Sequence, residues 1–87
     1  MRRNLEVPLK RLIAALEDLG YRRINRHRLE WRRKRFHAIL APRGRFVTLY
    51  LHVDVPVYVT PLIVHHTTRK TGRDITKEYR RITENLT

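Results

Sequence analysis

The sequence predicts an α+β domain, in the order helix, three or four antiparallel strands, helix, with both helices packed on one face of the sheet. Three observations support this class: apolar residues at helical spacing near the N-terminus, alternation of apolar and polar residues in the middle, and a second helical run near the C-terminus. The 87 residues fit a single domain that covers residues 1–87.

The first helix is expected over residues 8–19, after a short arm formed by residues 1–7. Pro8 suits a first helical turn, where its missing N–H group is not needed. Gly20 is placed to end the helix in a left-handed conformation. The apolar stripe that would pack on the sheet consists of Leu9, Leu12, Ile13, Leu16 and Leu19.

The clearest strand covers residues 46–55, where valine and leucine alternate with polar or aromatic residues. One face of this strand is therefore expected to be buried. The preceding PRGR, residues 42–45, predicts a hairpin turn in which Gly44 adopts a positive φ. That turn joins the strand to an earlier one at residues 35–41. Residues 22–33 extend that earlier strand, form a separate one or remain a loop.

The last part of the chain is expected to contain an edge strand, a loop and a helix. The strand is placed at residues 57–64, at an edge because Pro61 cannot donate a ladder hydrogen bond. Residues 65–71 would follow as a polar loop. The pattern TGRD at residues 71–74 resembles a capping box, which predicts the second helix over residues 73–85. Its apolar stripe would be Ile75, Tyr79, Ile82 and Leu86.

The charge of the chain indicates a polyanionic partner. The formal net charge is +12 and the pI is near 11.4, and eight of the fourteen residues from 22 to 35 are Arg or Lys. Such crowding is unfavourable without an anionic partner, and nucleic acid is favoured over an acidic membrane or a role in solubility alone. The candidates for phosphate contacts are Arg22, Arg23, Arg26, Arg28, Arg32, Arg33, Lys34, Arg35, Arg43, Arg45, Arg69, Lys70 and Arg73. Trp31 is the candidate for base stacking, with a place in the core as the alternative.

Composition narrows the remaining classes. The absence of Cys excludes disulfides and thiolate metal sites. No apolar run approaches the roughly 18 residues of a transmembrane helix, and no signal peptide is visible, so a cytoplasmic protein is expected. The lack of Ser and Gln, with few Asn, follows one trend of proteins from thermophiles.

A second constellation is His52-x-Asp54, whose side chains share one face of the predicted strand. His65 or His66 could join them from the next strand end, and His37 from another strand. Such a set of ligands suits a divalent metal, and beside basic residues it would suit a nuclease. The alternative is that Asp54 belongs to a turn and simply pairs with His52.

Two segments resemble known proteins. Residues 12–21 (LIAALEDLGY) look like the opening helix of HicA-type mRNA interferase toxins, and residues 72–82 (GRDITKEYRRI) look like the last helix of that family. This family has the architecture of double-stranded RNA-binding domains. The resemblance implies nucleic-acid binding and an antitoxin partner. The Gly-Ser-His catalytic signature of the family is absent, so ribonuclease activity by that mechanism is not implied.

The function predicted first is therefore a non-enzymatic, largely sequence-independent nucleic-acid-binding protein. One alternative is a small metal-dependent or toxin-like nuclease, so the question of enzyme activity stays open. Another is a homodimeric interaction module that pairs through the expected edge strand at residues 57–64.

Overall fold

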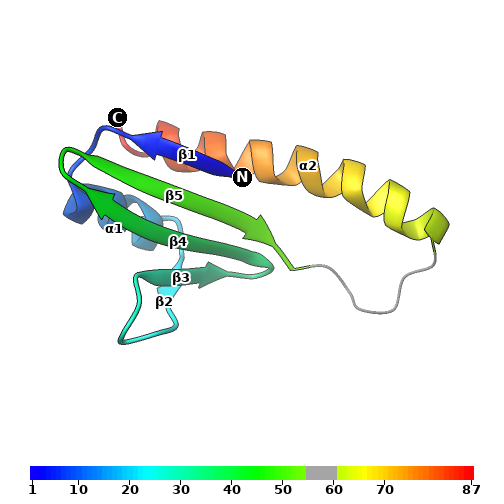
Figure 1. Cartoon of the computed structure of the whole chain (residues 1–87), viewed down its shortest axis with the longest axis horizontal. Coiled ribbons are helices and arrows are strands. Elements are labelled where there is room, and N and C mark those ends of the chain that lie inside the picture. The colour runs from blue at the N-terminus through cyan, green and yellow to red at the C-terminus, as the bar shows by residue number, and fades with distance from the viewer. Residues whose placement is uncertain (55–60) are drawn as a thin grey trace.

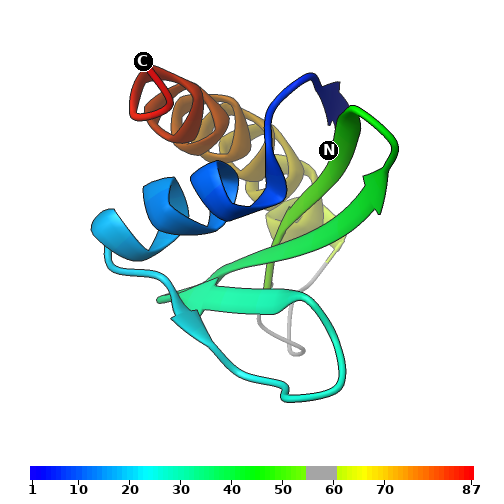
Figure 2. The same ribbon diagram turned by 90° about the vertical axis from the view of Figure 1, so that its left-hand side faces the viewer.

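The structure is a computed structural model that describes the backbone of residues 1–54 and 61–87 and the side chains of residues 1–54 and 70–87. An antiparallel sheet of five strands, in the order β1-β5-β4-β3-β2, lies against helices α1 and α2 (Figures 1 and 2). The predicted α+β class is confirmed. The elements are β1 (Arg2–Leu5), α1 (Leu9–Asp18), β2 (Arg22–Arg23), β3 (Glu30–Arg33), β4 (Phe36–Arg43), β5 (Phe46–Val53) and α2 (Pro61–Glu84).

Helix α1 forms where its apolar stripe predicts. Pro8 precedes the helix without a side-chain cap. At the other end Gly20 has φ +102°, and the N–H groups of Gly20 and Tyr21 donate to the carbonyls of Glu17 and Leu16, each at 3.0 Å. These two hydrogen bonds satisfy carbonyls that the end of a helix leaves free, as in a Schellman motif. The chain then enters β2.

The expected N-terminal arm is instead the edge strand β1. It pairs with β5 from Arg2 opposite Tyr50 to Leu5 opposite Val47. The prediction of an arm was wrong because four mostly polar residues carry no usable alternation, whereas the outer edge of β5 offers a full row of backbone partners. The sheet therefore has five strands, one more than the largest number expected.

The central hairpin matches the prediction. Strands β4 and β5 pair along their full length around Gly44, which has φ +58°. Residues 22–33 form two short strands, β2 and β3, joined by a loop at residues 24–29. The second hairpin turn, at Lys34 and Arg35, is also tight, and Lys34 adopts φ +55°.

Helix α2 begins much earlier than predicted. It starts at Pro61, so residues 65–71 are helical rather than a loop, and residues 71–74 lie inside the helix rather than in a capping box. The expected edge strand fails at residues 61–64, and its residues 57–60 lie outside the described part of the chain. Pro61 suits the first turn of a helix as well as an edge strand, and short apolar runs do not separate the two. Dimerisation through that strand is therefore no longer supported.

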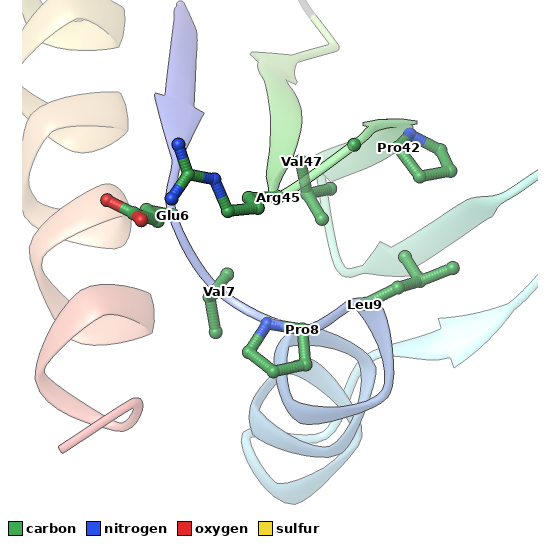
Figure 3. Close-up of a pocket in the computed structure, with 8 residues that line it drawn as sticks. Glu6, Val7, Pro8, Leu9, Pro42, Arg45 and Val47 are labelled. Atoms are coloured by element: carbon green, nitrogen blue, oxygen red, sulfur yellow. The ribbon is translucent and has the colours of Figure 1, made fainter.

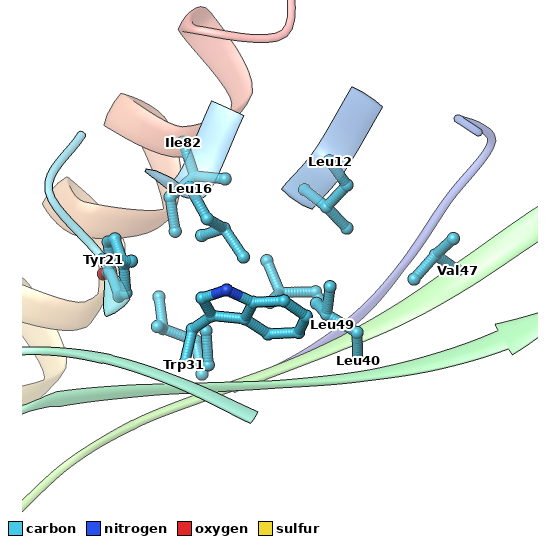
Figure 4. Close-up of a cluster of buried hydrophobic side chains, with 10 residues drawn as sticks. Leu12, Leu16, Tyr21, Trp31, Leu40, Val47, Leu49 and Ile82 are labelled. Atoms are coloured by element: carbon cyan, nitrogen blue, oxygen red, sulfur yellow. The ribbon is translucent and has the colours of Figure 1, made fainter. Parts of the chain in front are cut away.

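The core lies between the helices and one face of the sheet (Figure 4). The residues of β5 that were predicted to face inward are buried, and Leu49 and Leu51 are each 1% exposed. Trp31 from β3 is also 1% exposed and packs in the same cluster. Burying side chains of this size contributes about 1.5–3 kcal/mol each. The cluster comprises Leu12, Leu16, Tyr21, Trp31, Ala38, Leu40, Val47, Leu49, Leu51 and Ile82.

Candidate functional site

The loop between β2 and β3 carries arginines that have no acidic partner. Arg26 and Arg28 are exposed, and neither forms an ion pair within the described residues. In Figure 2 this loop, in cyan at the bottom of the view, projects away from the helices and the rest of the sheet. Two guanidinium groups are therefore presented to solvent on a projecting loop.

The shape of this loop is fixed by its own residues. The Arg23 guanidinium lies 5.3 Å from the centre of the Trp31 ring. From there it donates to the carbonyl oxygens of Asn25 at 3.0 Å and Arg28 at 3.3 Å. The Asn25 side chain in turn accepts from the backbone N–H of His27 at 2.8 Å. Arg23, predicted as a phosphate contact, thus braces the loop that presents the other arginines.

At the other end of β3 the arginines meet carboxylates. Arg32 pairs with Asp54, and the Arg35 guanidinium lies 3.7 Å from the Asp74 carboxylate. The closest association is that of Arg33, whose Nη2 lies 2.7 Å from both carboxylate oxygens of Glu78. The arginines between residues 22 and 35 therefore differ along the chain. Those of the loop have no carboxylate partner among the described residues, whereas those at the far end of β3 do. The two ends of β3 are separated by about 10 Å of strand.

Arg33 and Glu78 belong to the core rather than to a binding surface. Glu78 is 3% exposed and also accepts a hydrogen bond from the Tyr21 hydroxyl. Hydrogen bonding to Glu78 raises the pKa of Arg33, while burial and then the Glu78 hydrogen bond raise the pKa of Tyr21. The assignment of Arg33 from the sequence was wrong, because Arg33 is held by the buried Glu78 carboxylate and is not available to phosphates. The network instead ties α2 to β3.

Base stacking by Trp31 is also excluded, because its ring is enclosed between the sheet and the helices (Figure 4). Aromatic side chains are present instead on the face of the sheet away from the helices. Phe46 is 42% exposed, and Tyr50 is half-buried under the Arg2 guanidinium, which lies 5.7 Å from the ring centre. The sequence already indicates that Phe46 and Tyr50 face away from the core, because they alternate with the buried residues of β5.

A basic hollow lies between the β3–β4 turn and α2. It has a volume of about 360 Å³ and is lined by cations from both elements, including Lys34 and Lys77. Neither lysine forms an ion pair within the part of the chain that the structure describes. Lys34 is held there in a left-handed conformation, which costs a non-glycine residue about 1 kcal/mol or more. The remaining lining is Arg33, Arg35, Phe36, Asp74, Glu78 and Arg81.

The other predicted phosphate contacts are scattered. Arg43 and Arg45 are exposed at the β4–β5 turn, where Arg45 lines a pocket against the start of α1 (Figure 3). Lys70 and Arg73 are exposed but lie inside α2. From the sequence, Lys70 was expected in a loop and Arg73 at the start of the second helix, but α2 already begins at Pro61. The side chain of Arg69 lies outside the described residues. Arg22 is exposed in β2, in register with Arg32.

The structure brings His52 and Asp54 together and places beside them His37, one of the three further histidines that the sequence offered as partners. His37 and His52 face each other across β4 and β5, with Nδ1 of His37 3.1 Å from Nε2 of His52. Nε2 of His37 lies 3.2 Å from the Asp54 carboxylate, which also pairs with Arg32. Only the register of the two strands reveals His37 as the partner. The side chains of His65 and His66 lie outside the described residues.

Within this histidine cluster (His37, His52 and Asp54), the surroundings of His52 act on its charge. Partial burial, followed by the charge of His37, lowers the pKa of His52 below its ordinary value of 6.5. A neutral His52 has one ring nitrogen with a free lone pair. Nε2 of His37 is buried and makes no hydrogen bond of acceptable geometry within the described residues. The surroundings thus favour the neutral form of His52, close to the Asp54 carboxylate.

No protein-family model, curated protein or solved structure matches this chain. The resemblance of residues 12–21 and 72–82 to HicA-type proteins therefore stays a prediction.

None of the described helices combines the length and apolar character needed to cross a membrane.

Proposed function

We propose that this protein binds nucleic acid, DNA or RNA, chiefly through the phosphates. The observation that carries the proposal is the pair Arg26 and Arg28, exposed and without carboxylate partners among the described residues, on a loop that Arg23 holds in shape. A planar guanidinium donates two parallel hydrogen bonds to phosphate, and a braced loop loses less conformational entropy on binding than a flexible one.

The surrounding charge supports the same function. Arg43 and Arg45 lie at the β4–β5 turn, at the end of the sheet where the β2–β3 loop also lies. Lys34 and Lys77 line the hollow at the opposite end of β3, beside the β3–β4 turn. A nucleic-acid backbone that crosses the sheet between these ends would pass Phe46, whose exposed ring offers a flat face for stacking. Because phosphate contacts carry no sequence information, binding should depend little on sequence.

The test is a titration of labelled single-stranded DNA, duplex DNA and duplex RNA, followed by fluorescence anisotropy in buffer that contains chelator. We expect Arg26→Ala/Arg28→Ala to weaken binding by about tenfold on every substrate, because two phosphate contacts are lost. The matched control is Lys10→Ala/Arg80→Ala, which removes the same charge from exposed positions on α1 and α2 and should weaken binding much less. Wild-type affinity weaker than about 10⁻⁴ M at low salt on all three substrates would reject the proposal.

A small nuclease is the second candidate function, and the histidine cluster beside Arg32 favours it. Incubation of RNA and DNA with the protein, with several divalent ions and with chelator, tests this function. Substrates that stay intact under every condition remove it.

Three narrower predictions from the sequence accompany the proposal: a cytoplasmic location, a thermophilic source and an antitoxin partner of the HicA type. The first rests on the hydropathy of the chain, which has no long apolar run, the second on the missing Ser and Gln, and the third on the two helix segments.

A further inference from the structure

We propose that His37, His52 and Asp54 form a binding site for one divalent cation of the zinc class, with at least one coordination position left for water. The three side chains come from β4, from β5 and from the residue directly after β5. One potential ligand atom from each residue lies within 4.8 Å of the other two. This inference does not rest on nucleic-acid binding, because the site is measured with metal alone.

The spacing of the two imidazoles suits a shared cation. Nδ1 of His37 and Nε2 of His52 are 3.1 Å apart. Two nitrogens bound at about 2.0–2.1 Å to a tetrahedral zinc ion are about 3.3–3.4 Å apart, so only a small adjustment is required. The two residues are direct partners in the β4–β5 ladder, and the backbone hydrogen bonds of this hairpin hold that spacing before any cation arrives.

The carboxylate completes the set of ligands. Oδ2 of Asp54 faces both Arg32 and His37, which leaves Oδ1 without a hydrogen bond among the described residues. The Asp54 backbone N–H donates to the carbonyl of Arg35 at 2.9 Å and fixes the residue beside the β3–β4 turn. Arg32 would then orient the ligating carboxylate from outside, as hydrogen-bonding groups around metal sites do.

The choice of cation follows from the donor set. Two imidazoles and one carboxylate suit zinc and its neighbours in the first transition series, whereas calcium and magnesium prefer oxygen ligands alone. Three protein ligands also leave a tetrahedral ion one open position, which is the arrangement of catalytic rather than structural zinc sites. The site has no thiolate competitor, because the chain contains no Cys.

The experiment uses the full chain, stripped with chelator and dialysed. Cobalt(II) is titrated while its visible absorption is followed, and zinc is then added in competition. We expect one cation per chain and a loss of affinity of at least tenfold in His37→Ala, His52→Ala and Asp54→Asn. The matched control is His27→Ala, which removes an exposed histidine from the β2–β3 loop and should keep wild-type affinity. Far-UV circular dichroism checks that each variant is folded.

Three outcomes would overturn the assignment. The first is equal cobalt affinity in the wild type and in a folded His37→Ala/His52→Ala variant. The second is a loss of affinity only when His65 and His66 are replaced. The third is a change of less than about twofold in Asp54→Asn, which would reject the carboxylate as a ligand. Imidazole NMR signals of His37 and His52 that shift together on addition of zinc would support the site independently. Failure of these measurements would leave nucleic-acid binding in chelator untouched.

Discussion

The arginines near the two ends of strand β3 differ in whether a carboxylate pairs with them. At the loop end, Arg26 and Arg28 are exposed and unpaired within the described residues. At the turn end, Arg32 pairs with a residue 22 positions away and Arg33 with one 45 positions away. Local charge density therefore does not identify the arginines that are free to bind. Distant carboxylates select which of them stabilise the fold.

The largest effect should separate Arg33 from Arg26. Arg33→Ala leaves the carboxylate of Glu78 buried without its main partner, which should lower the free energy of unfolding by about 3–5 kcal/mol. Arg26→Ala should change it by less than about 0.5 kcal/mol, because the side chain is exposed and unpaired. Urea denaturation measures both values. Similar losses in the two variants would contradict the division of β3 into a structural and a binding end.

A smaller effect is expected at Arg23, which belongs to the binding end but braces its loop. Arg23→Ala removes two hydrogen bonds to carbonyl oxygens and the contact with the Trp31 ring. We expect a loss of about 1–2 kcal/mol in unfolding free energy. Nucleic-acid affinity should fall further than in Arg22→Ala, which removes the same charge from the same strand. Equal affinities in these two variants would show that the brace is unimportant for binding.

The exposed pair of Arg32 and Asp54 should contribute less. The two side chains are 45% and 42% exposed, so solvent screens their attraction. A double-mutant cycle of Arg32→Ala and Asp54→Ala, measured with chelator present, should give a coupling of about 0.2–1 kcal/mol. A coupling above about 2 kcal/mol would place this pair with Arg33 and Glu78 as a main support of the fold.

The smallest expected effect is the pH dependence from His52. Its pKa is lowered in the folded state, so the unfolded chain binds the proton more readily. This contribution to stability is complete above about pH 6.5 and is lost as the pH falls through the lowered pKa. Thermal melts of metal-free protein between pH 8 and pH 5 should therefore fall more in the wild type than in His52→Asn. His27→Asn serves as the control and should melt like the wild type throughout. Parallel curves for the wild type and His52→Asn would contradict the lowered pKa.

The parts of the fold that sequence predicts are those fixed by local chemistry. Gly20 and Gly44 supply positive φ where a helix ends and a hairpin turns, and the alternation in β5 identifies its buried face. Strand β1 could not be predicted, because it exists only through pairing with β5. The start of α2 was missed since Pro61 is compatible with both a strand edge and a helix.

For the candidate site too, local sequence identifies individual residues, whereas their partners depend on distant parts of the chain. Strand periodicity placed His52 and Asp54 on one face, but the choice of His37 as their partner depends on the register of β4 and β5. The arginines that the sequence suggested as phosphate contacts include the exposed residues of the loop. They also wrongly include Arg33, because its partner Glu78 is distant in sequence. Trp31 failed as a stacking residue because its size favours the core of a small domain.

The most direct test of nucleic-acid binding by the loop end is the slope of log affinity against log salt concentration. It is measured side by side for the wild type, Arg26→Ala/Arg28→Ala and Lys10→Ala/Arg80→Ala. The loop variant should have a slope smaller by about 2, because each lost phosphate contact releases about one counterion fewer. The control should keep the wild-type slope. Equal slopes for the wild type and the loop variant would contradict the account.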